Sequence, residues 1–152
     1  MELAQNEVGK GRYLIFKLDN EDYALEVHKI KEIIKYTKVT EVPNASCYVK
    51  GVISLRGVVV PVLDIKKCFG IPDKEPTKMT RIIVVNYKEQ VAGLPVDSID
   101  EVKNISSDTM VPLPKFGERE KLEFLKGIIE FKDKFILVLK TSVLLDRLKY
   151  GY

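Results

Sequence analysis

Short apolar runs separated by polar turns make up most of this chain, and the alternation predicts strands rather than long helices. Four polar residues, 19–22, separate the first two runs and predict a β-hairpin. A second hairpin is expected around Arg56-Gly57, which lies between two further runs. The strands predicted in this half of the chain are Tyr13 to Leu18, Tyr23 to Val27, Tyr36 to Val42, Val49 to Leu55 and Val58 to Leu63.

Helical patterns occur at only a few places. Apolar residues recur at helical intervals from Val27 to Ile34, so we expect a short helix or helical turn after the second strand. Asp64 can cap a helical turn over Ile65 to Phe69. Ser142 can cap a helix near the carboxyl end that has one apolar face and packs across both halves of the chain. These helices are few and short, so the expected fold class is mainly β.

The chain also repeats its own pattern. Residues 12–17 match residues 81–86 at an offset of 69. After an insertion at residues 115–121 the offset becomes 76, which aligns residues 49–53 with residues 125–129. Agreement in residue type and turn position over this length indicates a duplication.

The duplication predicts two structural units in tandem, residues 12–72 and residues 79–150, joined by a linker at 73–78. Five short strands in so small a unit usually close into a barrel, because an open sheet leaves unpaired edges. Each barrel would have a thin core on its own. We therefore expect the two units to share apolar surface and to exchange a strand, although the pattern does not say which one.

Composition argues against catalysis. The 152 residues, 45% hydrophobic and 31% charged, suffice for a core without metals or disulfides. The one histidine, His28, is expected at the surface, and we interpret the two separate cysteines, Cys47 and Cys68, as small buried hydrophobes in a reducing cytoplasm. This inventory predicts no metal site.

Motifs for covalent chemistry are missing as well. No hydroxyl nucleophile has a base beside it, and neither a glycine-rich phosphate loop nor a dinucleotide fingerprint occurs. We interpret the carboxylates at strand ends, Asp64, Asp97 and Asp100, as helix caps and turn formers. The sequence therefore predicts no enzyme, no catalytic residue and no cofactor.

The formal net charge of +3 comes from interleaved lysines and acids, without a run of five like charges. We therefore expect no nucleic-acid binding. The apolar runs are too short to span a membrane, and residues 1–11 do not resemble a signal peptide. A cytoplasmic protein without direct membrane insertion is predicted.

One arginine interrupts two nearly unbroken apolar strands, at Leu55-Arg56-Gly57. It is either a solvent-facing turn residue or the partner of a carboxylate, since a guanidinium holds a carboxylate in a fixed bidentate geometry. Glu32 is the partner we expect, and its alternative interpretation is an exposed helix residue. The repeat equivalents are Glu101 and Lys132, so such a pair is weaker or absent in the second half.

The chain has more apolar residues than one face per strand requires. Core packing explains them, or else a groove at the junction of the two units accepts the apolar stripe of a partner helix. Phe116, inside the polar insertion, is a candidate interface anchor. The candidate groove residues are Leu14, Val27, Ile30, Ile33 and Ile99.

These segments together resemble the CheW-like family of chemotaxis coupling proteins. The resemblance covers essentially residues 12–149, and its most specific part is Leu55-Arg56-Gly57 with the following Pro61-Val62. Ser54, Pro95 and Lys140 depart from the family's usual residues. The other matching segments are Leu14 to Phe16, Glu32 to Ile34, Val42-Pro43, Tyr48 to Ser54, Ala92 to Ser98 and Phe124 to Gly127.

The resemblance implies a fold of two tandem five-stranded SH3-like β-barrels with a few short helices, including a C-terminal helix. It implies a non-catalytic adaptor that bridges the cytoplasmic tip of chemoreceptors and the regulatory domain of the CheA histidine kinase, at receptor arrays. The roles that it implies are a receptor groove at Leu14, Val27, Ile30, Ile33 and Ile99, an ion pair of Glu32 with Arg56, motif backbone at Gly51 and Gly57, and kinase-side contacts at Val59 and Phe116.

Two alternatives from other classes stay open at this point. A CheV-like adaptor would need an attached receiver domain, which 152 residues cannot contain. A small β-barrel that binds another partner, such as nucleic acid, would show affinity for oligonucleotides that falls steeply with salt.

Overall fold

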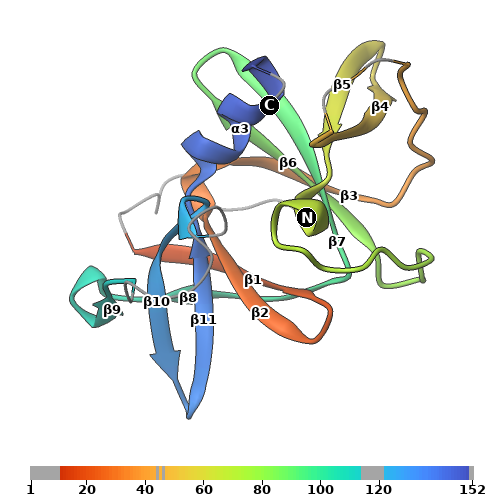
Figure 1. The fold of residues 1–152 in the computed structure, drawn as a ribbon. Helices are drawn as coiled ribbons and strands as arrows, with labels where there is room; N and C mark the ends of the chain where they lie inside the picture. The colour runs from red at the N-terminus through yellow and green to blue at the C-terminus, as the bar shows by residue number, and fades with distance from the viewer. Residues whose placement is uncertain (1–10, 44, 46, 114–121, 151–152) are drawn as a thin grey trace.

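The computed structural model describes residues 11–113 and 122–150, apart from residues 44 and 46. Its strands form two sheets with a few short helices (Figure 1), which confirms the predicted mainly-β class. The first sheet has the order β8 (Ser98–Asn104), β1 (Arg12–Leu18), β2 (Glu21–Glu26), β11 (Lys134–Leu139), β10 (Leu125–Phe131) and β9 (Met110–Val111). The second has the order β3 (Ile30–Lys35), β6 (Arg81–Tyr87), β7 (Gln90–Val96), β5 (Val58–Leu63) and β4 (Val49–Leu55).

Each sheet takes strands from both halves of the repeat. The β1–β2 hairpin lies in the first sheet with β8 to β11, whereas β6 and β7 lie in the second sheet with β3 to β5. Four strand pairs join the halves. Two are antiparallel, β1 with β8 and β3 with β6, and two are parallel, β2 with β11 and β5 with β7. The units 12–72 and 79–150 therefore describe the sequence repeat, and their boundaries stay a prediction.

In the part of the chain that the structure describes, four short helical segments connect or follow the strands. They are η2 (Val27–Lys29), α1 (Ile65–Cys68), η3 (Ser107–Thr109) and α3 (Thr141–Tyr150). Asp64 caps α1 as predicted, because its Oδ1 accepts a hydrogen bond of 3.1 Å from the Lys67 N–H. The predicted carboxyl-terminal helix is confirmed as α3, which starts one residue before Ser142 and buries Leu144 and Leu145.

Of the short helix or helical turn expected after the second strand, the structure has the turn, η2, and the helical spacing beyond it belongs to a strand. Only η2 is helical, and Ile30 begins strand β3, which pairs with β6. The register of that pairing shifts between Ile30 and Glu32. Such a bulge interrupts the alternation of faces, and the resulting spacing of apolar residues imitated a helical period.

The strand expected over Tyr36 to Val42 is also wrong. Strand β3 ends at Lys35, and within the segment only Thr40 forms a bridge, with Val52 of β4. Tyr36 and Val39 pack against a small buried cluster that includes Ile53, so their apolar character reflects packing without a ladder. The interpretation of Cys47 as buried is wrong as well, because it is exposed, whereas Cys68 is buried as predicted.

The two sheets share a central core. Leu14 and Leu25 of the first sheet and Ile83 and Leu94 of the second are fully buried in one cluster. The aromatic rings of Phe16, Tyr23 and Phe69 pack in sequence, Phe16 on Tyr23 and Tyr23 on Phe69, and extend this cluster toward α1. The two sheets therefore form a single packed body.

The first glycine of the motif, Gly51, stands where two segments of backbone approach closely. A Cβ at this position would lie 2.2 Å from the Thr40 carbonyl oxygen and 2.8 Å from Val39 Cγ1. Next to it, Thr40 and Val52 exchange two backbone hydrogen bonds of 2.9 Å each. A side chain at residue 51 would therefore push the segment around Thr40 away from β4.

We expect Gly51→Ala to lower the free energy of unfolding by about 2 kcal/mol or more, because the new Cβ meets backbone atoms that cannot move independently. Urea denaturation followed by circular dichroism measures this loss. Gly57→Ala is the matched control: no atom lies within 4 Å of its Cβ position, and only its positive φ of 79° opposes a side chain. That strain costs about 1 kcal/mol, and equal losses in the two variants would contradict the role of the Thr40 approach.

Candidate functional site

The five candidate groove residues all belong to the central core or pack against it. Leu14, Val27 and Ile30 are buried, with exposed fractions of 0%, 3% and 7%. Ile33 on β3 and Ile99 on β8 are only partly buried, and these strands are edge strands of different sheets. We call Ile33 and Ile99 the junction surface, because they are the least buried of the five.

Glu32 and Arg56 contact each other in the structure. The Arg56 Nη1 and Nη2 atoms donate to both carboxylate oxygens of Glu32 at 2.8 to 3.1 Å, which is a bidentate geometry. The Arg56 side chain is 67% exposed and the Glu32 side chain 19%. Arg56 has a φ of 49° in the turn between β4 and β5, and this turn aims the guanidinium at β3.

This ion pair joins the two edges of the second sheet. β3 and β4 are the outermost strands in the sheet order, yet Glu32 of β3 reaches the turn that follows β4. The Thr40–Val52 bridge brings the chain after β3 to β4 in the same way. The Gly51 and Arg56 positions of the motif therefore both serve the contact between these edges.

The repeat equivalents of the pair engage other partners. Glu101 Oε1 lies 2.8 Å from Lys103 Nζ. Lys132 Nζ lies 5.3 Å from the centroid of the Phe131 ring, and Lys103 Nζ lies 3.4 Å from the same centroid. The two hairpin turns thus have the same backbone, with a φ of 49° at both Arg56 and Lys132, but different side-chain contacts.

Both hairpins of the repeat expose apolar side chains near their turns. Val58 and Val59 at the start of β5 are 61% and 67% exposed, and Phe135 on β11 is 64% exposed. Phe135 stands 76 residues after Val59, which is the offset of the repeat. The repeat alignment could therefore have pointed to Phe135 as the counterpart of Val59. Phe116, the other predicted kinase-side residue, lies outside the described residues.

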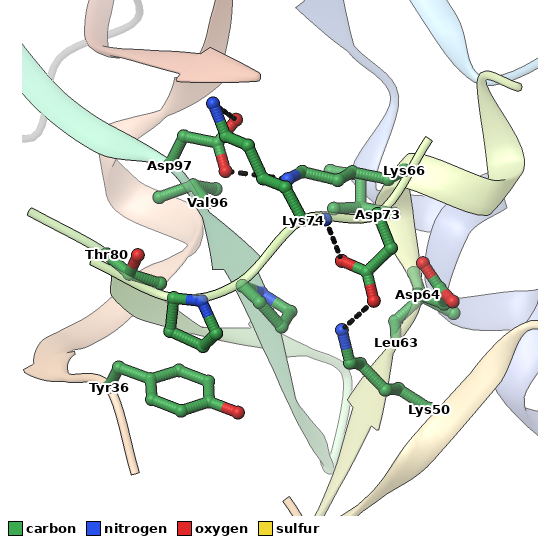
Figure 2. A pocket seen from close by; sticks show the side chains of 13 residues that line it. Tyr36, Lys50, Leu63, Asp64, Lys66, Asp73, Lys74, Thr80, Val96 and Asp97 are labelled. Atoms are coloured by element: carbon green, nitrogen blue, oxygen red, sulfur yellow. Dashed lines mark hydrogen bonds and ion pairs between the residues drawn. The ribbon is translucent and has the colours of Figure 1, made fainter. Parts of the chain in front are cut away.

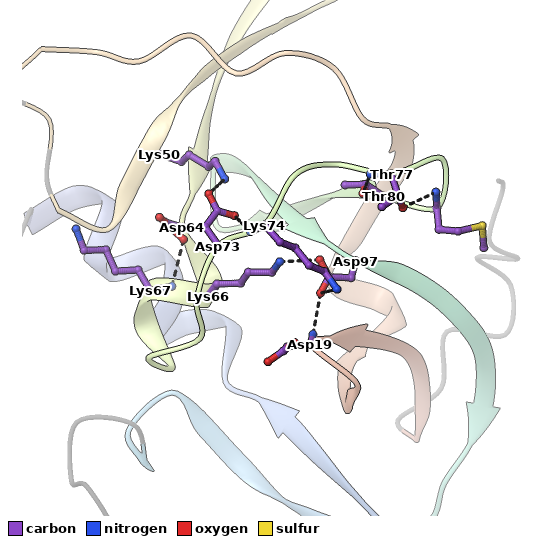
Figure 3. Close-up of polar contacts among 11 residues, drawn as sticks. Asp19, Lys50, Asp64, Lys66, Lys67, Asp73, Lys74, Thr77, Thr80 and Asp97 are labelled. Atoms are coloured by element: carbon purple, nitrogen blue, oxygen red, sulfur yellow. Dashed lines mark hydrogen bonds and ion pairs between the residues drawn. The ribbon is translucent and has the colours of Figure 1, made fainter.

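A third cluster surrounds Asp97, the single residue between β7 and β8. Its Oδ1 accepts a hydrogen bond of 2.7 Å from Lys66 Nζ, and its Oδ2 accepts one of 2.7 Å from the Asp19 N–H. Lys74 Nζ lies 3.7 Å from Oδ2. Figure 2 shows Lys66 of α1 and Lys74 of the linker beside Asp97, and Figure 3 shows Asp19 of the β1–β2 turn as well. We call these four residues the Asp97 cluster; the interpretation of Asp97 as a helix cap or turn former accounts for neither hydrogen bond, because the partners are 31 and 78 residues away.

The neighbours of Asp97 stabilise its charged form. Burial on its own raises the pKa of Asp97, but the hydrogen bonds from Lys66 and from the Asp19 N–H, together with the charges of Lys66 and Lys74, outweigh this and hold the pKa below its usual range. In the linker, the bond from Lys50 Nζ to Asp73 at 3.0 Å overcomes the effect of burial and lowers the pKa of Asp73 too.

Two other kinds of feature are absent from the described part of the chain. It contains no group of His, Cys, Asp and Glu residues that could hold a metal ion, and no helix in it is long and apolar enough to cross a membrane. His28 is exposed as predicted, with Nε2 3.3 Å from Glu26 Oε2. The cavity beside the Asp97 cluster has a volume of about 30 Å³, which is room for roughly one water molecule.

Comparison with known proteins agrees with this picture. The model of the CheW-like domain family matches residues 12–149. The chemotaxis protein CheW of Klebsiella aerogenes is 32% identical over 145 residues, which are 95% of this chain and 87% of that protein. The chemotaxis protein CheW of Bacillus subtilis is 29% identical over 136 residues, covering 90% of this chain and 87% of that protein.

A solved structure shows the same similarity in three dimensions. The crystal structure of the scaffolding protein TtCheW from Thermoanaerobacter tengcongensis has a TM-score of 0.78 to this chain and is 32% identical to it. The match covers 92% of this chain and 90% of that one. The likeness therefore extends over both sheets.

The lowered pKa values of Asp97 and Asp73 predict a loss of stability in acid. The unfolded carboxyls take up protons near pH 3.9, above the folded-state pKa values, so the stabilisation is complete above about pH 5 and is lost as pH falls through the folded values. Urea denaturation at a series of pH values measures this. Asp97→Asn should reduce the pH dependence more than Asp73→Asn, because their side chains are 17% and 60% exposed. Identical pH dependences for Asp97→Asn and the parent would contradict this assignment.

Proposed function

This chain belongs to the CheW-like family and is a non-enzymatic adaptor of chemotaxis, and we propose that it binds a chemoreceptor tip and the CheA regulatory domain at the same time. The observation that carries the proposal is that one packed body has accessible apolar side chains in two places. One is the junction surface of Ile33 and Ile99, and the other is the hairpin tip at Val58 and Val59.

The junction surface is the proposed receptor side. Ile33 and Ile99 stand on edge strands of the two sheets, and Leu14, Val27 and Ile30 support them from the core. Apolar side chains on a rigid support suit the apolar stripe of a helix, which presents residues at intervals of three and four positions. A receptor tip is a helical hairpin, as the resemblance implies, and it supplies such a stripe.

The tip of the β4–β5 hairpin is the proposed kinase side. Val59 is 67% exposed although it is apolar, and an exposed apolar side chain suits the apolar core of an interface. The ion pair of Arg56 with Glu32 holds the turn against β3, so the tip is presented in one orientation. Phe116 is proposed for the same side on the resemblance alone.

Coupling needs no covalent step in this proposal. Two partners that bind one rigid body are held at a fixed separation, and each raises the effective concentration of the other. We place the protein in the cytoplasm, where its partners would recruit it to receptor arrays. The sequence units 12–72 and 79–150 are proposed as the evolutionary repeats from which this body is assembled.

Arg56→Ala should weaken formation of the ternary complex by about tenfold while it changes the free energy of unfolding by less than about 1 kcal/mol, because the Arg56 side chain is 67% exposed. Co-sedimentation of the protein with receptor-tip fragments and the CheA regulatory domain measures the first quantity, and urea denaturation the second. Lys88→Ala is the matched control, since Lys88 also has a positive φ, 57°, in a turn of the same sheet. An Arg56→Ala variant that binds both partners like the parent would contradict the proposed role of the Arg56–Glu32 pair in complex formation.

The two surfaces should also be separable. Val59→Ser is expected to lower the affinity for the CheA regulatory domain by about tenfold and to leave receptor-tip binding intact, whereas Ile33→Thr has the opposite effect. Titration of each purified partner by calorimetry measures both affinities. Val111→Ser, at a valine that is 49% exposed, is the control for loss of an exposed apolar side chain. The proposed function fails if the parent protein binds neither partner.

A further inference from the structure

Two charged side chains with little exposure, Lys66 and Asp97, lie outside both proposed partner surfaces, in the Asp97 cluster. The side chains of Lys66 and Asp97 are only 10% and 17% exposed. The cavity beside them, about 30 Å³, is far below the roughly 300 Å³ of a small ligand pocket. These charges therefore contact each other rather than a bound molecule.

Asp97 lies at the point where the chain passes from the second sheet to the first. The chain leaves the second sheet at Val96, the end of β7, and enters the first sheet at Ser98, the start of β8. The Asp97 N–H donates to the Lys17 carbonyl of β1 at 3.0 Å. One residue thus determines the direction in which the chain passes between the sheets.

The two carboxylate oxygens of Asp97 reach elements that belong to different sheets. Oδ2 binds the N–H of Asp19 in the β1–β2 turn of the first sheet. Oδ1 binds Lys66 of α1, which follows β5 of the second sheet directly. As Figure 3 shows, the carboxylate stands between these elements, so a rotation of one sheet against the other breaks at least one bond.

The other crossing between the sheets is built differently. The repeat equivalent of Asp97, 69 residues earlier, is His28 in η2, between β2 and β3. Its side chain is 39% exposed and lies 3.3 Å from Glu26, which belongs to the strand that precedes it. This contact stays on the side of the first sheet, whereas the Asp97 contacts span both.

We propose that Asp97 is a positioning residue that fixes the orientation of the two sheets and thereby the spacing of Ile99 from Ile33. Ile99 follows Asp97 by two residues on β8, and Ile33 stands on β3 of the other sheet. The consequence for receptor binding rests on the proposed function; the consequence for sheet orientation does not. The hairpin tip at Val59 lies within the second sheet alone, so kinase binding should not depend on Asp97.

The test uses Asp97→Asn and the double variant Lys66→Met with Asp97→Asn. The single variant leaves a buried ammonium without its carboxylate and is expected to lose stability. The double variant removes both charges and avoids that penalty, so it reports on orientation in a folded protein. Asp100→Asn, an exposed carboxylate three residues further along β8, is the matched control for a lost charge.

Pairs of spin labels at Asn86→Cys and Glu130→Cys, in a Cys47→Ser background, report the distance between the sheets, since these exposed residues stand on β6 and β10. We expect one narrow distance distribution in the parent and in Asp100→Asn, and a broader or shifted one in the double variant. Receptor-tip affinity of the double variant should fall about tenfold. Its affinity for the CheA regulatory domain should stay within about twofold of the parent value.

A double variant with the parent's distance distribution overturns the inference, whatever its affinities are. Equal losses of affinity for both partners also overturn it, because general destabilisation has that effect. A parent protein that binds no receptor tip, together with a broadened distribution in the double variant, refutes the proposed function and supports the role of Asp97 in sheet orientation.

Discussion

Each sheet is completed by strands from the other half of the repeat, and the rest of the structure depends on this exchange. The parallel pairs β2–β11 and β5–β7 join segments far apart in the chain, which no tight turn can connect. Neither half has a complete sheet until the other half is present. The central core follows from the same constraint, because Leu14 and Leu25 pack there with Ile83 and Leu94. Two sequence repeats therefore make one body.

The two sheets follow one plan and complete it differently. Gly51 and its repeat equivalent Gly127 both stand where a Cβ would strike a neighbouring segment, at Thr40 and at Met110 respectively. In the first sheet that segment forms strand β9, whereas in the second it forms only the bridge at Thr40. The bidentate pair of Arg56 with Glu32 occurs in the second sheet, where the segment opposite Gly51 pairs through a single residue, Thr40, rather than through a strand. A guanidinium suits this position, since a lysine lacks the planar fork that fixes both carboxylate oxygens.

Sequence periodicity predicted the hairpins because side chains of a half-buried strand alternate between core and solvent. It failed at Ile30, where a bulge changed the alternation, and at Tyr36, which packs without joining a ladder. The Arg56–Glu32 contact was open to prediction, because a lone arginine between apolar strands needs a partner. The Asp97 cluster was not, since Lys66 and Asp19 are 31 and 78 residues from Asp97 and only the fold brings them together.

The contrast between buried charge and exposed apolar surface suits an adaptor. Replacing a buried ion pair by apolar residues is often neutral or stabilising, so net stability is a weak reason for a carboxylate at Asp97. A charged hydrogen bond adds direction, because Lys66 and the Asp19 N–H each approach one oxygen at 2.7 Å, whereas apolar contacts tolerate sliding. Directional contacts inside the body hold its geometry, and apolar residues such as Val59 at its surface are free to fit a partner. An adaptor that transmits position rather than chemistry requires both.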